Sequence, residues 1–162
     1  MATEATAAKF FSSKYFAVVG ASTDPSKFGH KIFTWYTQHA LPVTPINPTA
    51  AQIKAFGAWP DLEQKSFDTL PNISELPNPK ETGVSIITPP RVTIEVLKEA
   101  KKLGIQSVWL QPGTFNDEVI QFANENFEAP VAGDGGRGGE GWCVLVDGEK
   151  ALGAAGKSEG KL

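Results

Sequence analysis

The sequence predicts an α/β fold in which a mainly parallel sheet of about five strands has helices on both faces. Short apolar segments alternate along the chain with longer amphipathic segments. Apolar runs of about four to eight residues between turn residues are typical of buried strands, whereas an apolar residue at every third or fourth position is typical of a helix. Alternation of the two predicts parallel strands joined by crossover helices.

The most informative stretch runs from residue 16 to residue 39. Residues 16–19 form an apolar run that stops at Gly20, and a helical pattern follows from residue 27 to residue 39. Backbone N–H groups in the first turn of a helix lack intrahelical partners, and the helix dipole favours an anion there. The stretch therefore predicts a phosphate-binding turn at residues 20–22.

Other elements follow from the same patterns. The further predicted strands are residues 43–48, 56–59, 84–87, 107–110 and 142–146. The further predicted helices are residues 49–54, 91–103 and 116–127, with short helical turns at 9–14 and 73–76. Residues 61–80 are predicted as a loop, and residues 130–132 lead into a glycine-rich loop. The prolines in residues 43–48 favour a position at the edge of the sheet.

A single folded domain accounts for most of the 162 residues. We place it at residues 10–147, with a flexible N-terminus at 1–9 and a disordered tail at 148–162, because neither end shows an apolar pattern. No apolar run approaches the roughly 18–20 residues of a membrane span. The first residues lack the basic start and apolar core of a secretory signal, so we expect a cytoplasmic protein.

Composition excludes several functional classes. A net charge of −3 argues against broad electrostatic binding to nucleic acid or to an anionic membrane. The single cysteine, Cys143, can form neither an intrachain disulfide nor a cysteine-based zinc site. No carboxylate pair, adjacent nucleophile and base, or metal-ligand cluster stands out, so we name no catalytic residue and no metal ligand. A serine–histidine–acid triad assembled in space stays open.

Four turns follow predicted strands at their carboxyl ends. They are residues 20–22, 47–48, 88–90 and 111–113. In parallel sheets, ligands bind outside these ends, at the point where the strand order reverses. We therefore expect the four turns to lie together and to bind a small-molecule nucleotide cofactor. The predicted contact residues in and beside these turns are Gly20, Ala21, Ser22, Lys27, Asn47, Pro48, Thr88, Pro89, Pro90, Arg91, Gln111 and Gly113.

The turn after the first strand departs from the dinucleotide fingerprint G-x-G-x-x-G. Gly20 fits the first glycine, but Ser22 and Pro25 occupy the other two positions. The second strand ends in Asn47, where a dinucleotide site has an acidic residue for the ribose. A phosphate-binding Walker loop is also missing, because no glycine-lysine-serine/threonine triplet opens the first helix. An NAD(P)-binding, oxidoreductase-like protein is therefore the alternative rather than the main hypothesis.

Several separated motifs resemble one family. They are Val18-Val19-Gly20-Ala21-Ser22 followed by Pro25, Lys27 and Gly29, then Pro45-Ile46-Asn47-Pro48, Thr88-Pro89-Pro90 and Trp109-Leu110-Gln111-Pro112-Gly113. Together they resemble the small stand-alone CoA-binding proteins, which are similar to the CoA-binding domain of the succinyl-CoA synthetase α subunit. The resemblance covers about residues 10–146 and implies a Rossmann-like, three-layer αβα domain.

The resemblance implies coenzyme A or an acyl-CoA as the cofactor. Its pyrophosphate would lie over residues 20–22 with Lys27 nearby, and residues 47–48 and 88–90 would flank the adenosine. We assign the 3′-phosphate to Arg91, with Lys54 as the second candidate. The chain departs from the family near Cys143. The family usually has an acidic residue and an arginine directly before that cysteine, whereas here Glu140-Gly141-Trp142 precede it.

These observations favour a non-catalytic CoA or acyl-CoA binding protein that acts as a sensor, a carrier or a partner of an acyl-CoA enzyme. The alternatives are the oxidoreductase-like protein and an interaction module with a vestigial nucleotide pocket. A homodimer and an acyl-CoA enzyme both stay open as protein partners. The role of Cys143 and that of the glycine-rich loop at 133–141 stay open as well.

Overall fold

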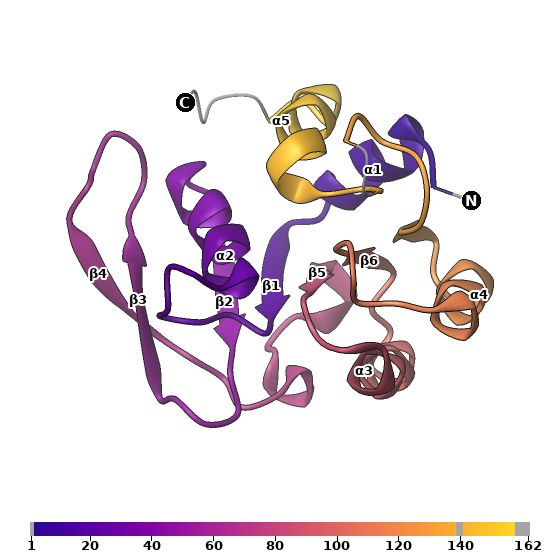
Figure 1. The fold of residues 1–162 in the computed structure, drawn as a ribbon, viewed down its shortest axis with the longest axis horizontal. Helices are drawn as coiled ribbons and strands as arrows, with labels where there is room; N and C mark the ends of the chain where they lie inside the picture. Colours follow the sequence, from indigo (N-terminus) through magenta and orange to yellow (C-terminus); the bar gives the residue numbers. More distant parts are fainter. Residues whose placement is uncertain (1, 139–140, 158–162) are drawn as a thin grey trace.

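The computed structural model describes residues 2–138 and 141–157 and contains a five-stranded parallel sheet between two layers of helices (Figure 1). The strands of this sheet are β1 (Tyr15–Val19), β2 (Val43–Ile46), β5 (Thr82–Ile86), β6 (Ser107–Leu110) and β7 (Ala129–Val131). Their order is β2-β1-β5-β6-β7, and every neighbouring pair is parallel. The predicted Rossmann-like three-layer α/β fold is confirmed, and so is the edge position of the proline-containing second strand.

The helices are α1 (Glu4–Phe11), α2 (Phe28–Gln38), α3 (Pro90–Leu103), α4 (Asp117–Asn126) and α5 (Val144–Ala154). Two short 3-10 helices lie at Ile73–Glu75 and Pro79–Glu81. The predicted helices at 27–39, 91–103 and 116–127 are confirmed to within two residues at each end. Of the helices in the described ranges, none is long and apolar enough to cross a membrane.

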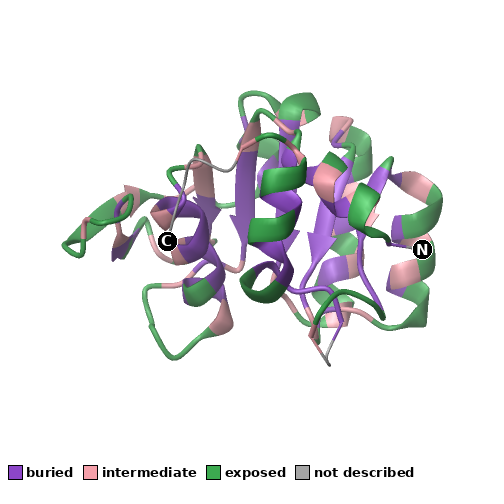
Figure 2. Ribbon diagram, turned by 90° about the horizontal axis from the view of Figure 1, so that it is seen from above, coloured by how far each residue is buried: buried purple, intermediate pink, exposed green. Residues whose placement is uncertain are grey.

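Two hydrophobic clusters lie on the two faces of the sheet. Phe16 and Val18 of β1 pack with residues of α1, α2 and α5, whereas Ala17 and Val19 pack with residues of α3 and α4. Successive side chains of a strand point to opposite faces, so a strand covered on both sides must be apolar throughout. Figure 2 shows the result, with buried strands and with helices that expose only their outer faces.

A separate antiparallel hairpin projects beside the main sheet, formed by β3 (Gln52–Phe56) and β4 (Gln64–Asp68) (Figure 1). The predicted helix at 49–54 and strand at 56–59 are therefore wrong, and residues 61–80 are not all loop. In β3, Ile53 and Ala55 are buried while Gln52 and Lys54 are exposed, which is the two-residue period of a strand.

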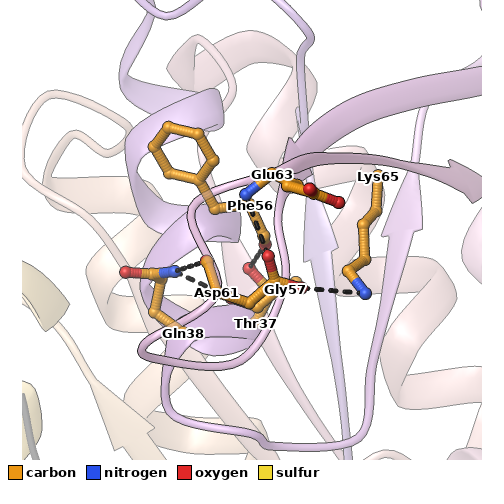
Figure 3. A network of polar contacts seen from close by, with 7 residues as sticks. All are labelled: Thr37, Gln38, Phe56, Gly57, Asp61, Glu63 and Lys65. Carbon is orange, nitrogen blue, oxygen red and sulfur yellow. Dashed lines mark hydrogen bonds and ion pairs between the residues drawn. The ribbon is translucent and has the colours of Figure 1, made fainter.

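The last turn of α2 fastens this hairpin through a network of polar contacts (Figure 3). Thr37 Oγ1 donates a hydrogen bond to the carbonyl oxygen of Phe56 at 2.7 Å. Gln38 Nε2 donates to the carbonyl oxygens of Gly57 (2.7 Å) and Asp61 (3.3 Å). Helix α2 is thus tied to the connection between β3 and β4 as well as to the main sheet.

Helix α5 replaces the strand predicted at 142–146 and the start of the tail predicted at 148–162. Val144, Ala151 and Leu152 are buried on one side, while Leu145 and Val146 are exposed. This burial follows the helical period, so the β-branched residues do not decide the local structure. The last five residues of the predicted tail, 158–162, lie outside the described residues.

Helix α1 occupies most of the predicted flexible N-terminus at 1–9 and replaces the short helical turn predicted at 9–14. The Thr3 side chain caps α1 and forms a reciprocal capping box with Thr6. Phe10 and Phe11 are fully buried against the sheet, close to the rings of Phe16 and Trp109. Burial of these two aromatic side chains holds α1 in place.

Candidate ligand-binding site

The strand order reverses at the carboxyl ends of β1 and β5. From β1 the chain passes to β2 at the sheet edge, and it then returns to β5 on the other side of β1. Ligands of open α/β sheets bind at such a reversal. The turn at Gly20–Ser22 follows β1 and Thr88 follows β5, so two of the predicted turns flank the reversal point.

Gly20 packs directly against the backbone that follows β5. Its φ is +96°, and a Cβ at this position would lie 2.3 Å from the carbonyl oxygen of Ile87. A Cβ on Gly29, in the first turn of α2, would lie 1.9 Å from the carbonyl oxygen of Gly20. Both glycines are therefore required for close backbone packing, which brings the amino end of α2 down onto the turn.

Polar contacts hold the segment between this turn and α2. Ser22 Oγ accepts a hydrogen bond from Asp24 N at 3.1 Å, and Asp24 Oδ1 accepts from Ser26 Oγ (2.7 Å) and Ser26 N (2.9 Å). The hydrogen bonds from the Ser26 side chain and backbone lower the pKa of Asp24 below its usual value. The carboxylate is therefore ionised at neutral pH and fixes the segment.

His30 takes part in the same arrangement. Its Nδ1 lies 2.9 Å from the carbonyl oxygen of Ser22, and since a carbonyl only accepts, Nδ1 carries the hydrogen. His30 is 8% exposed, so its imidazole is buried between α2 and the turn. No sequence motif links His30 to the site. Its place in the first turn of α2 was the only available signal.

Two helices begin at the reversal point without a side-chain cap. Lys27 precedes α2 and Pro89 precedes α3; neither helix has a side-chain cap hydrogen bond or an acidic residue in its first turn. In contrast, Thr3 caps α1 and Asn116 caps α4, and both of these helices have acidic residues in the first turn. An uncapped, non-acidic amino end suits an external anion.

Asn47 ties the turn after β2 to the turn after β1. Its Nδ2 donates to the carbonyl oxygen of Ala21 at 3.0 Å, and its Oδ1 accepts from Thr49 N and Ala50 N at 2.9 Å. This side chain therefore positions the Gly20–Ser22 turn. The neighbouring Pro48 is exposed at the same edge.

The predicted residues after β5 form the entry to α3. Thr88 and Thr93 share a hydrogen bond between their hydroxyl groups at 2.7 Å, which fastens the turn to the first turn of the helix. Pro90 is the first residue of α3, where its missing N–H costs nothing. Arg91 follows it and is exposed.

The predicted residues after β6 differ in burial. Gln111 is fully buried, and its Oε1 accepts from Val144 N at 3.0 Å, so its side chain supports the start of α5. Its Nε2 has no hydrogen-bond partner among residues 2–138 and 141–157. Gly113 is exposed with φ +89°, and a Cβ there would meet no atom within 4 Å.

Exposed cationic residues stand around the reversal point. Thr23 Oγ1 accepts from Lys54 N at 2.9 Å, which places β3 beside the segment after β1. Lys27 and Arg91 stand at the starts of α2 and α3. Among the ion pairs within the described part of the chain, none involves Lys27, Lys54 or Arg91. The residues present therefore fit a ligand that carries several phosphates.

Comparison with known proteins gives a family match and similar solved structures. A family model described as a CoA binding domain matches residues 14–138. The chain is similar to a solved conserved hypothetical protein from Pyrococcus furiosus, with 28% identity, a TM-score of 0.58, and coverage of 70% of this chain and 87% of that chain. It also resembles a hypothetical protein from Pyrococcus horikoshii OT3, with 24% identity, a TM-score of 0.71, and coverage of 93% and 92%. The second likeness shows the shared fold.

Proposed function

Because the chain belongs to the CoA-binding domain family, we propose that it binds coenzyme A or an acyl-CoA at the carboxyl edge of the sheet. The observation that carries the proposal is the pair of helices, α2 and α3, that start uncapped and without acidic residues at the reversal point. Helices α1 and α4 of the same chain have both a cap and acidic first turns.

The pyrophosphate belongs at the Gly20–Ser22 turn in this proposal. The first turn of α2 offers backbone N–H groups and the positive end of the helix dipole, and exposed Lys27 adds a cation. Gly29 and Gly20 bring these groups close to the turn, because no side chain separates the two backbones.

The 3′-phosphate belongs to Lys54 or Arg91. Lys54 is fixed beside the turn through its backbone bond to Thr23, whereas Arg91 extends from the start of α3 on the other side of the reversal point. Either side chain can pair with a phosphate, and the guanidinium of Arg91 can do so through two hydrogen bonds. We therefore keep both Lys54 and Arg91 as candidates for the 3′-phosphate contact.

The proposed role is binding without catalysis. CoA supplies a thiol that carries an acyl group as a thioester. Two titratable side chains beside the turn, Asp24 and His30, hold the backbone in place through their hydrogen bonds with Ser26 and Ser22. Because these hydrogen bonds give Asp24 and His30 a structural role, they support a protein that acts as a sensor, a carrier or a partner of an acyl-CoA enzyme.

Isothermal titration of the purified chain with CoA, dephospho-CoA and NADH tests the proposal. CoA is expected to bind most tightly, and dephospho-CoA about tenfold or more weakly, because it lacks the 3′-phosphate. Tighter binding of NADH than of CoA would overturn the proposal. Equal affinities for CoA and dephospho-CoA would contradict only the proposed contact with the 3′-phosphate.

Single variants then assign that contact. Lys54→Gln and Arg91→Gln each remove one charge, and Lys101→Gln, in the last turn of α3, is the matched control. The variant at the contact residue should lose the preference for CoA over dephospho-CoA, while Lys101→Gln keeps it. Retention of the full preference by both site variants contradicts the assignment to Lys54 or Arg91.

A further inference from the structure

The tip of the β3–β4 hairpin exposes apolar side chains on a part of the molecule that projects beside the main sheet (Figure 1). Trp59 is 49% exposed and Leu62 is 60% exposed, and Pro60 between them is exposed as well. The other three tryptophans of the chain are at most 8% exposed. Single exposed apolar residues are common, but two large ones within four residues of one loop indicate an interaction surface.

Polar contacts hold this tip in place. Trp59 N donates a hydrogen bond to the carbonyl oxygen of Gln38, in the last turn of α2, at 3.0 Å. Asp61 Oδ1 accepts from Glu63 N at 2.9 Å, and Asp61 Oδ2 pairs with Lys65 Nζ at 2.9 Å (Figure 3). A surface that is fixed before binding loses little conformational entropy when a partner covers it.

An open depression of about 260 Å³ lies at the amino ends of β1, β2 and β5. Its lining includes the buried side chains of Phe16 and Leu76, together with Pro42, Val43 and Pro77. An engineered cavity of about 150 Å³ holds benzene, so this depression has room for an indole ring. None of the residues predicted for the nucleotide site lines it.

The tip and the depression lie on the same side of the molecule. Gln38, which binds Trp59, is followed by residues 39–42, and this connection reaches the depression at Pro42. The candidate ligand site is at the other end of the strands. A face with both a projecting indole and a recess for one is self-complementary, because a two-fold axis lets each copy insert one ring and receive one.

The charges beside the two features are opposite in sign. Glu63 is exposed at the tip, and Lys14 is exposed next to Tyr15, which lines the depression. Lys14 Nζ lies 5.6 Å from the centroid of the Tyr15 ring, so the ammonium group stands at the rim. Among the ion pairs within residues 2–138 and 141–157, none involves Glu63 or Lys14. Opposite charges beside an apolar contact favour one orientation of the partner.

We propose that two copies of this chain form a two-fold dimer through this face. Trp59 of each copy enters the depression of the other copy, and Glu63 pairs with Lys14 of the partner subunit. The two-fold axis repeats each contact, so the tip contributes two buried rings and two ion pairs to one interface. The dimer leaves the carboxyl ends of the strands open, so the proposal does not depend on CoA binding.

Sedimentation equilibrium between about 1 µM and about 100 µM tests for the dimer, and acrylamide quenching of tryptophan fluorescence tests its interface. Trp59 is the exposed one of four tryptophans, all of which the structure describes, so quenching reports mainly on this residue. A monomer–dimer equilibrium is expected, with quenching at least twofold weaker in the dimer. A monomer over the whole range, an assembly larger than a dimer, or a dimer that keeps the quenching of the monomer would overturn the proposal.

Removal of the indole tests the apolar contact. Trp59→Ala should raise the dissociation constant of the dimer at least tenfold, because the depression then loses its occupant. Leu145 is also exposed (41%) but belongs to α5, so Leu145→Ala is the control and should leave the dissociation constant unchanged. Thermal unfolding checks that both variants are folded. A folded Trp59→Ala variant that dimerises as tightly as the unchanged chain contradicts the proposed contact.

An exchange of charges tests the ion pair and stays informative whatever the effect of Trp59→Ala on the hairpin. Glu63→Lys and Lys14→Glu should each weaken the dimer at least fivefold, because each places like charges together. The double variant restores opposite charges and should return the dissociation constant to within about twofold of the original value. Lys102→Glu, at an exposed position of α3, is the control and should leave dimerisation unchanged. A double variant that dimerises as weakly as the single variants contradicts the pairing of Glu63 with Lys14.

Discussion

Gly20 and Gly29 set the distance between the turn after β1 and the first turn of α2. The sequence pattern predicted Gly20 at a ligand site from one observation, the end of the first strand at this residue. Gly20 also packs against the carbonyl oxygen of Ile87, which lies nearly seventy residues later in the chain. No local sequence pattern indicates that contact. A variant of Gly20 therefore perturbs the fold before it perturbs a ligand.

Gly20→Ala should cost at least about 3 kcal/mol of unfolding free energy, because it combines a left-handed φ with a backbone clash. Gly113→Ala has a similar φ but open space around the new Cβ, so it should cost only about 1–2 kcal/mol. Urea denaturation measures both values. Equal losses of unfolding free energy in the two variants would show that the contact with Ile87 does not exclude a side chain at residue 20.

Side-chain roles at the site were only partly predictable. Asn47 and Gln111 were expected at the carboxyl edge, and both are there. Asn47 forms hydrogen bonds within the turns, and Gln111 accepts a hydrogen bond from Val144 N. Both side chains therefore support neighbouring segments. These bonds depend on the arrangement of strands from distant parts of the chain. The contacts of the twelve predicted residues with a ligand stay predictions.

At the scale of elements, β4 and α5 show where sequence patterns mislead. In β4 all residues but one are exposed, so no apolar pattern indicates a strand. In α5 the run Val144-Leu145-Val146 is typical of a strand, yet Val144, Gly148, Ala151 and Leu152 form the buried face of a helix. Packing against α1 and α2 overrides local propensity here. The strands β1, β5 and β6 were predictable because both of their faces are covered.

Two threonines of α2 provide a matched test of its contact with the hairpin. Thr37→Val removes the hydrogen bond to Phe56 O, so it should cost about 1–2 kcal/mol. Thr34 Oγ1 is buried without a partner among the described residues, so Thr34→Val should be neutral or stabilising. Urea denaturation of the two variants measures the difference. A loss for Thr34→Val as large as that for Thr37→Val contradicts the assigned hydrogen bonds.

At the scale of the whole molecule, one face of the sheet is covered by α1, α2 and α5 together. Gly148 of α5 packs against the Trp35 ring, where a Cβ would lie 2.5 Å from the nearest ring atom. Lys150 of α5 pairs with Glu4 of α1. The parallel sheet was predictable from the alternation of elements, but its cover by the last helix was not, because alanine and glycine give a weak apolar signal.

Leucines on the two sides of α5 test this cover. Leu152 is 2% exposed, and Leu152→Ala should lower the unfolding free energy by about 2–5 kcal/mol. Leu145 is 41% exposed, so Leu145→Ala should change it by less than about 0.5 kcal/mol. Thermal and urea unfolding both report the effect. Similar small changes for the two variants would show that α5 does not pack on the sheet.

Stability at alkaline pH depends on Tyr36. Burial raises the pKa of its hydroxyl well above the usual value, while the hydrogen bond with Ser85 opposes the shift more weakly. Unfolded tyrosine ionises near pH 10 whereas the folded residue keeps its proton, so unfolding releases a proton above that pH. The unfolding free energy should then fall by about 1.4 kcal/mol per pH unit from this group.

Tyr36→Phe should remove that contribution. Denaturation from pH 9 to pH 11 measures the slopes of both proteins, and the lysine contribution cancels in their difference. Parallel curves for the two proteins would contradict a buried, protonated tyrosine. The lost bond to Ser85 shifts the variant's curve at every pH without changing its slope.

The contact of α1 with α5 also has a consequence for synthesis on the ribosome. Helix α1 packs against β6, β7 and α5, which are all made late, and Glu4 meets Lys150 across 146 residues of sequence. The first helix therefore leaves the exit tunnel long before its partners exist. Until β6 is made, Phe10 and Phe11 lack their contact with Trp109, so α1 reaches its final packing only after the carboxyl end of the chain has been synthesised.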